Sequence, residues 1–314
     1  MSGAFSTVQK KYFGAQAVAV KIYSKNQGKE VQRHYQRELW ALRTLAFDSE
    51  AAAKERHIIY LFSAESDNDN YYLTFPFYDS TLSEFLSCRN SPIAHSCVAQ
   101  LARGLHFLHK QGIIHCDLSP SNILIDDDNH MVIADFGCAH SNDTQQRHAE
   151  ENGPAEIGTR YYKAPEHLFG YRVYTPATDV WSLGTIFCRL LLGYPIFAGE
   201  TDLEQIGFIV RGLGRPPSSV VKEEMQKYPD VNKLIFFTDA DEEEDTSEEL
   251  AEESSTDDEF EMPNVQRKSI LSAFKEEGVL IEDLTLAKRM LTWSVKNRID
   301  TQTLISYCDK NGWK

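Results

Sequence analysis

The sequence predicts an α+β fold in which a small strand-rich part is followed by a larger helical part. Two apolar runs in the first quarter of the chain, 18–23 and 71–78, are typical of strands, and the intervening residues 31–45 have helical spacing. After residue 78 the apolar pattern is largely helical. With 314 residues and 42% hydrophobic composition, the chain can form one large domain or two lobes around a substantial core.

Apolar patterns also mark the elements of the second part. Residues 96–112 carry apolar side chains along one helical face. The short runs 122–125 and 131–135 predict a hairpin around a polar turn. The nearly continuous apolar run 178–193 predicts a buried core helix, and helical spacing returns at 284–293.

Most of the negative charge lies in one segment, 239–261. It holds 14 of the 47 Asp and Glu residues and no Lys or Arg, so the formal net charge of −15 becomes about −1 without it. The segment has too few large apolar side chains to offset the entropy of ordering, so we expect a disordered acidic insertion. The near-neutral remainder has no broad basic field, and nucleic-acid binding is therefore not expected.

Cysteine spacing and hydropathy exclude other classes of protein. The six cysteines show no Cys-x-x-Cys spacing and no nearby paired histidines, so neither a disulfide framework nor a zinc site is expected. No apolar run approaches the roughly 18 residues of a membrane-spanning helix, and the first residues lack a signal-peptide pattern. We expect a soluble protein of the nucleus, the cytoplasm or both, without membrane association.

Four short motifs follow one another in the chain. They are Val-Ala-Val-Lys ending at Lys21, His-Cys-Asp-Leu-Ser-Pro-Ser-Asn at 115–122, Asp-Phe-Gly at 135–137 and Ala-Pro-Glu at 164–166. Each is weak alone. In this order and at these separations, with Glu38 on the intervening helix, they resemble the signature set of the eukaryotic protein kinases.

The resemblance covers nearly the whole chain and implies a bilobal protein-kinase fold. Residues 1–77 would form the β-rich N-lobe, and residues 78–314 the helical C-lobe with the acidic insertion inside it. Residues 2–8, SGAFSTV, are similar to the second half of the family's glycine-rich loop, with Gly3 as its middle glycine. We therefore expect the first strand of the N-lobe to be missing and the loop to be shortened.

Phosphoryl transfer requires positioning and charge neutralisation more than covalent chemistry. By the resemblance, Asp117 is the base that accepts the proton of the substrate hydroxyl. Lys21 would contact the α and β phosphates and be held by Glu38. Asn122 and Asp135 would hold Mg²⁺, which prefers hard oxygen ligands. The alternatives are a solvated surface lysine and aspartates that only form turns.

The resemblance also implies an ATP-binding pocket beside these groups. Residues 71–78 resemble the hinge of the cyclin-dependent kinases, with Phe75 at the back of the adenine pocket and Ala19, Val8 and Leu124 around the adenine. The residues expected to contact the nucleotide are Gly3, Val8, Ala19, Lys21, Phe75, Phe77, Tyr78, Leu124 and Asp135. ATP and Mg²⁺ are the expected cofactors.

The segment TRYYKAPE at 159–166 closely resembles the cyclin-dependent and mitogen-activated kinase group, which phosphorylates serine and threonine. Within that group, segments 166–170 and 228–236 resemble the fungal single-subunit kinases that activate cyclin-dependent kinases. The expected substrate is a protein, with the activation loop of a cyclin-dependent kinase as the candidate. The helix around Glu38 lacks the PSTAIRE sequence that grips a cyclin, so we expect a monomer without cyclin dependence.

Two supporting interactions are implied by the same resemblance. Glu166 and Arg298 would form an ion pair that anchors the activation segment, and Asp179 would steady the catalytic loop from the start of the core helix.

The chain departs from the family pattern at several positions. Ser6 stands where the third loop glycine would be, Cys116 replaces the arginine of His-Arg-Asp, and Ser119 replaces a lysine that touches the γ-phosphate. The group's usual activating phosphorylation site falls on Pro154, which has no hydroxyl. We therefore expect activity without loop phosphorylation. The alternative is a pseudokinase, a regulatory scaffold without transfer activity.

Overall fold

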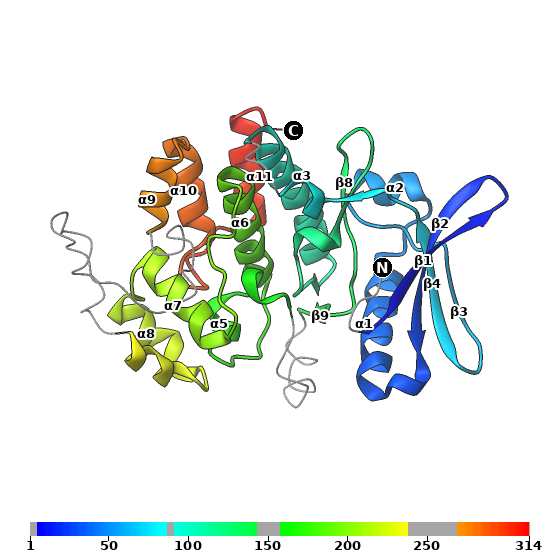
Figure 1. Cartoon of the computed structure of the whole chain (residues 1–314), viewed down its shortest axis with the longest axis horizontal. Coiled ribbons are helices and arrows are strands. Elements are labelled where there is room, and N and C mark those ends of the chain that lie inside the picture. Colours follow the sequence, from blue (N-terminus) through cyan, green and yellow to red (C-terminus); the bar gives the residue numbers. More distant parts are fainter. Residues whose placement is uncertain (1–4, 87–90, 143–157, 238–268, 314) are drawn as a thin grey trace, which may run out of the picture.

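The computed structural model describes residues 5–86, 91–142, 158–237 and 269–313. They form two lobes, a sheet with two helices at one end of the molecule and a helical bundle at the other (Figure 1). The α+β fold with a small β-rich lobe and a large helical lobe is thus confirmed. The predicted acidic insertion, Gly3 and Pro154 lie outside the described residues, and the lobe boundary after residue 77 stays a prediction.

The small lobe is an antiparallel sheet of four strands among the described residues, in the order β1-β2-β4-β3. Along β2, Ala19, Lys21 and Tyr23 share one face because side chains alternate across a strand. Pairing places Lys21 opposite Val8 in β1 and Leu73 in β4. The strands are β1 (Thr7–Phe13), β2 (Gln16–Ser24), β3 (Ser63–Ser66) and β4 (Asn70–Pro76).

Helix α1 (Lys29–Leu45) packs beside this sheet (Figure 1). Its buried residues Val31, Tyr35, Glu38 and Leu42 recur every three or four positions, so they form one face toward the lobe interior. Glu38 is the one carboxylate on that face, and it is 1% exposed. The short helix η1 (Lys25–Gln27) precedes α1, and α2 (Glu50–Glu55) follows it.

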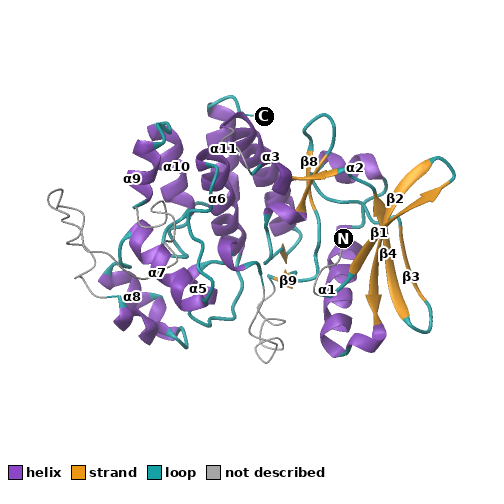
Figure 2. Ribbon diagram, viewed as in Figure 1, coloured by secondary structure: helices purple, strands orange, loops and turns teal. Residues whose placement is uncertain are grey.

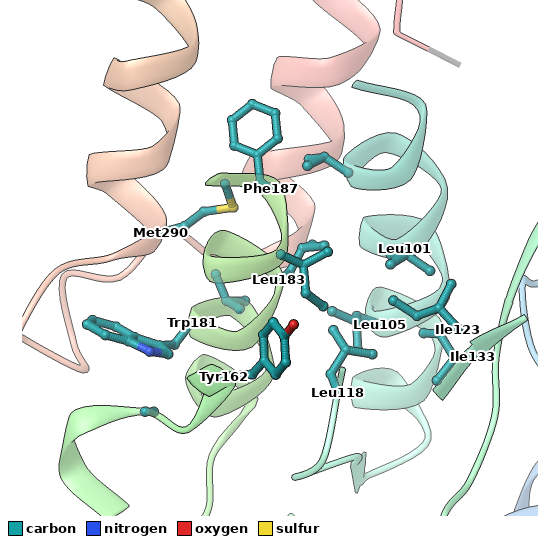
Figure 3. Packing of buried hydrophobic residues seen from close by; sticks show 14 of the residues in the cluster. Leu101, Leu105, Leu118, Ile123, Ile133, Tyr162, Trp181, Leu183, Phe187 and Met290 are labelled. Atoms are coloured by element: carbon teal, nitrogen blue, oxygen red, sulfur yellow. The ribbon is translucent and has the colours of Figure 1, made fainter. Parts of the chain in front are cut away.

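The large lobe is built around α6 (Pro176–Leu192), which is buried on nearly all sides. Figure 3 shows Leu183 of α6 facing Leu105 of α3 (Ser91–Lys110), and the two helices are in contact. Gly184 allows α10 to approach closely, because a Cβ atom there would lie 2.8 Å from the Met290 side chain. The other helices are α3 (Ser91–Lys110), α5 (Pro165–Leu168), α7 (Asp202–Leu213), α8 (Ser218–Glu223), α9 (Ile270–Glu276), α10 (Ile281–Met290) and α11 (Thr301–Lys310).

Short strands between the lobes hold the loops that carry two of the sequence motifs, 115–122 and 135–137 (Figure 2). The predicted hairpin is confirmed as β7 (Ile123–Ile125) paired with β8 (Met131–Ile133). β8 ends at Ile133, two residues before Asp135, which has a left-handed backbone with φ of +62°. The remaining elements are β5 (Ser80–Thr81), β6 (Ile113–Ile114), β9 (His140–Ser141), η2 (Leu82–Phe85), η3 (Pro120–Asn122), η4 (Arg160–Tyr162), η5 (Met225–Lys227) and η6 (Val231–Phe236).

The other predicted elements agree with the structure except near their ends. The strand 71–78 stops at Pro76, after which the chain leaves the sheet. The helix predicted at 96–112 begins earlier, at Ser91, and the one predicted at 284–293 spans Ile281–Met290. In the ranges that the structure covers, no helix is both long and apolar enough to cross a membrane.

The predicted ion pair between Arg298 and Glu166 is present and buried. Two guanidinium nitrogens of Arg298 donate to the two carboxylate oxygens of Glu166, at 2.8 and 3.0 Å. The side chains are 0% and 3% exposed. The guanidinium also donates to the carbonyls of Ala177 and Thr292, so it joins α5, α6 and the segment after α10.

We predict that Arg298→Leu lowers the free energy of unfolding by about 3–5 kcal/mol, because it leaves the buried Glu166 carboxylate without a partner. Urea unfolding followed by circular dichroism measures this change. The matched control is Lys288→Leu, at an exposed position of α10, for which we expect a change within about 0.5 kcal/mol. Equal effects of the two substitutions would contradict the role given to the ion pair.

Candidate functional site

A pocket of about 310 Å³ lies between the sheet of the small lobe and the β7 region of the large lobe. Its walls come from β1, β2, α1, β4 and the segments around β5, η3 and β7. The sequence-predicted residues that line it are Val8, Ala19, Lys21, Glu38, Phe75, Phe77, Tyr78, Asn122, Leu124 and Asp135. Asp117 is not in this lining but lies on the adjoining loop, beside Thr159 and Lys163.

Lys21 is the charged centre of the pocket. Its Nζ lies 2.9 Å from Glu38 Oε2 and 2.9 Å from Asp135 Oδ1, and its side chain is 8% exposed. Burial opposes the charge of Lys21, but the carboxylates of Asp135 and Glu38 outweigh burial and raise its pKa well above the ordinary value. The lysine is therefore held as a cation at the end of the pocket where β2, α1 and the segment after β8 meet.

Glu38 is fixed by two further contacts that the sequence motifs do not reveal. The Tyr23 hydroxyl donates a hydrogen bond to Glu38 Oε2, and the backbone N–H of Phe136 donates to Glu38 Oε1 at 3.3 Å. Tyr23 reaches Glu38 because it shares the face of β2 with Lys21. The two-residue period of a strand indicates that Tyr23 and Lys21 point to the same face of β2. It does not indicate the hydrogen bond from Tyr23 to Glu38.

Asp135 combines a buried ion pair with an exposed edge. Burial raises its pKa, but the Lys21 charge outweighs burial and the net shift is downward, so this carboxyl is ionised. Its side chain is nevertheless 43% exposed, toward the pocket that it lines. The backbone N–H of Gly137 donates to Asp135 Oδ1 at 3.2 Å.

Asp117 is held by groups on both sides of its loop. Asn122 Nδ2 donates to the Asp117 carbonyl at 2.8 Å and to its Oδ2 at 3.3 Å. The backbone N–H and the hydroxyl of Thr159 donate to Asp117 Oδ1 at 2.8 and 3.0 Å. The sequence places Thr159 in a family motif but does not predict its contact with Asp117.

The pKa of Asp117 is raised. Burial is the largest cause and the nearby Asp135 charge is the next, while the hydrogen bonds from Thr159 act in the opposite direction. A carboxylate with a raised pKa is a better proton acceptor, as a general base requires.

The loop that carries Asp117 is anchored to the core helix through Asp179. The backbone N–H groups of His115 and Cys116 donate to the two carboxylate oxygens of Asp179, each at 2.9 Å. His109 Nε2 lies 2.8 Å from the same carboxylate, and Asp179 is 0% exposed. The supporting role implied for Asp179 agrees with this geometry. Cys116 itself adopts a φ of +65° beside the anchor.

Asn122 and Asp135 offer side-chain oxygen atoms that are suited to coordinate a magnesium ion. Because Nδ2 of Asn122 faces Asp117, its Oδ1 remains as the atom that can coordinate a metal. Asp135 adds an ionised carboxylate that is partly exposed to the same pocket. One carboxylate and one amide oxygen suit Mg²⁺, which takes few protein ligands and keeps several waters.

The two substituted positions of the catalytic loop lie in apolar or buried surroundings. Cys116 packs with Ile114 and Cys138 and against Tyr174, so an apolar cluster occupies the place of the family's arginine. Ser119 is 2% exposed and is not among the described residues that line the pocket. Within that lining the two cations are Lys21 and, at the other end beside Phe77 and Asp79, Lys10.

Several residues of the pocket wall were not predicted as site residues from the sequence. They are Lys10, Ile59, Pro76, Asp79, Thr81, Ser121 and Ala134. Ser121 and Ala134 directly precede Asn122 and Asp135, so their position next to motif residues was a signal for them. Ile59 carried no such signal, because a backbone hydrogen bond to the Ile133 carbonyl, between residues distant in the chain, brings it to the pocket.

Comparison with known proteins agrees with this geometry. The family model described as protein kinase domain matches residues 2–307. Human cyclin-dependent kinase 20 is 35% identical over 187 residues, 58% of this chain and 52% of that protein. The serine/threonine-protein kinase crk1 of Schizosaccharomyces pombe is 35% identical over 194 residues, 60% of this chain and 55% of that protein. The chain thus spans about half the length of these relatives.

A solved structure extends the likeness to the fold of the whole chain. The CAK complex of Chaetomium thermophilum bound to ATP-γ-S contains a chain that superposes with a TM-score of 0.70 at 25% identity. The superposition covers 98% of this chain and 87% of that one. Since the family model spans nearly all of the sequence, and Lys21, Asn122 and Asp135 from three of the motifs line one pocket, the chain belongs to the protein kinase domain family and resembles the cyclin-dependent kinases within it.

Proposed function

We propose that this chain is a serine/threonine protein kinase that transfers the γ-phosphate of ATP to a hydroxyl group of a protein substrate. The observation that carries the proposal is the placement of Lys21 within 2.9 Å of both Glu38 and Asp135, in a pocket that also contains Asn122. Such a pocket combines a fixed cation for phosphates with oxygen ligands for a metal. The adjoining Asp117 supplies a base.

Each group has a defined task in this reaction. The apolar walls of the pocket, Ala19 and Leu124 among them, would enclose the adenine. Lys21 would hold the phosphates and neutralise their charge without moving, because Glu38 fixes it. Asp117 would orient the substrate hydroxyl and accept its proton at the carboxylate. Bound Mg²⁺, held by Asn122 and Asp135, would neutralise charge that develops on the phosphate oxygens.

The proposed substrate is the activation segment of a cyclin-dependent kinase. The support is the chain's likeness to the CAK complex and the resemblance of segments 166–170 and 228–236 to kinases that activate cyclin-dependent kinases. We further propose that the chain acts as a monomer without a cyclin, in the nucleus, the cytoplasm or both.

Activity without phosphorylation of the activation segment is part of this proposal. Cys116 stands where the family has a phosphate-binding arginine. The Cys116 side chain packs in the cluster with Ile114, Cys138 and Tyr174. A thiol in that cluster cannot form the bidentate hydrogen bonds that arginine makes with a phosphate. Asp179 instead holds the loop through backbone N–H groups.

A pseudokinase scaffold is the second candidate, and Ser119 is the observation that favours it. Because Ser119 replaces a lysine that touches the γ-phosphate, the transition state loses one positive charge. Loss of one such contact lowers the rate of transfer by a factor of about 10²–10³. The chain would then bind nucleotide and partners without measurable transfer.

We predict that the purified chain transfers ³²P from the γ-position of Mg-ATP to at least one member of a panel of cyclin-dependent kinases. Asp117→Asn should lower the rate by about 10²–10⁴, because it removes the general base. The matched control, Asp128→Asn in the exposed turn before β8, should retain the parent rate. Nucleotide binding without transfer to any panel member would favour the pseudokinase, and equal rates for parent and Asp117→Asn would contradict the role of Asp117.

Thr159→Val should move the acidic limb of the pH–kcat profile to higher pH. The Thr159 hydroxyl donates to the Asp117 carboxylate and favours its charged form, so its removal raises the pKa of the base. A base must be ionised, so activity is lost as the pH falls through that pKa. The control Thr303→Val removes a threonine hydroxyl that donates to Asp300 at the start of α11, and it should leave the profile unchanged. A limb that stays in place or moves to lower pH in Thr159→Val would contradict this account.

A further inference from the structure

One cluster that the proposed mechanism does not use joins three segments distant in the sequence. The ring of Phe5, just before β1, stacks on the imidazole of His34 in α1 with ring centroids 3.9 Å apart and planes 19° apart. The same imidazole lies against the backbone of Gly137, where an added Cβ atom would be 3.1 Å from His34 Nδ1. Gly137 therefore leaves the space that His34 occupies.

Each of these segments carries a group of the candidate site. Glu38 follows His34 by four residues, so the two lie on the same side of α1. Gly137 donates its backbone N–H to Asp135. Val8 pairs with Lys21 across the sheet, so the first residues of β1 lie at the Lys21 end of the pocket.

Strand β1 has few other contacts with the protein interior. It is an edge strand that pairs with β2 alone among the described strands. Of its residues, Val8 is partly buried and the other six are exposed. The partly buried Phe5 thus adds to the apolar contact that Val8 makes at this end of β1.

The imidazole suits a stacking role rather than a charged one. Burial, followed by the Arg37 charge, lowers the pKa of His34 below its ordinary value, so the ring is neutral near pH 7. A neutral ring does not compete with Lys21 for the carboxylate of Asp135.

We propose that His34 is a positioning residue for nucleotide binding, whose stack with Phe5 and contact with Gly137 hold the start of β1 and Asp135 around the phosphate end of the pocket. This inference rests on the proposed function, because it takes ATP as the nucleotide that the pocket binds. His34 acts through Asp135 and β1, and it is not itself a member of the pocket lining.

The test is the dissociation constant of Mg-ATP, measured by calorimetry on the full chain, together with the kinetics of transfer. His34→Ala should raise Kd and the KM for ATP roughly three- to tenfold, the range expected for loss of one aromatic pair with its burial. Its kcat should change by less than about twofold, because the reacting groups remain. His34→Phe retains a ring for the stack and should restore Kd to within about twofold of the parent value.

Two further variants sharpen the test. Phe5→Ala should raise Kd, and the double variant should bind no more weakly than His34→Ala alone, because the stack is already lost in that single variant. Phe5→Ala also tests the stack if His34→Ala does not fold, since it leaves α1 unchanged. Gln36→Ala, at an exposed position of the same helix, is the matched control and should not alter Kd.

Unchanged Kd and KM in His34→Ala would overturn the inference, and so would a His34→Phe variant as weak as His34→Ala. A parent chain that binds Mg-ATP but transfers no phosphate would contradict the proposed function alone, because the Kd comparison still decides the role of His34. A parent chain that binds no Mg-ATP would contradict both.

Discussion

The buried ion pairs of Lys21 are the interaction on which the site depends. A lysine that is 8% exposed is stable as a cation only beside opposite charge, and Glu38 and Asp135 provide it from two different segments. The same two contacts fix the distance between β2, α1 and the residues after β8. The charged end of the pocket therefore depends on the packing of β2 and α1 against the segment after β8.

Around this centre, the structure fixes polar groups through the backbone as much as through side chains. Phe136 holds Glu38, Gly137 holds Asp135, and Thr159 holds Asp117, each through a backbone N–H. A backbone N–H donor is retained in every substitution except one to proline. This explains how the chain can keep an ordered site although Cys116 and Ser119 differ from the family pattern, since the anchor from Asp179 also binds backbone N–H groups.

The sequence was most informative where residues with catalytic side chains occur at the spacing of a family motif. The fold and the elements that carry Lys21, Glu38 and Asp135 could be predicted because strand and helix periods and motif order are local properties of the chain. The contacts of Tyr23, Thr159 and His34 could not, because each depends on a partner from a segment that only the tertiary fold brings near. The left-handed backbone of Asp135 was missed for another reason, since such a backbone at a non-glycine residue has no clear sequence signal.

The most direct measurement of the central claim is the single-turnover rate of phosphate transfer from Mg-ATP by Lys21→Met beside the parent chain. The account predicts a rate about 10²–10³ lower, since one fixed cation is lost from the phosphate end of the pocket while Asp117 and Asn122 remain. The control is Lys10→Met, which removes the cation at the opposite end and should cost far less. A Lys21→Met chain that transfers phosphate at the parent rate would show that the ion pairs of Lys21 organise the fold but not the reaction.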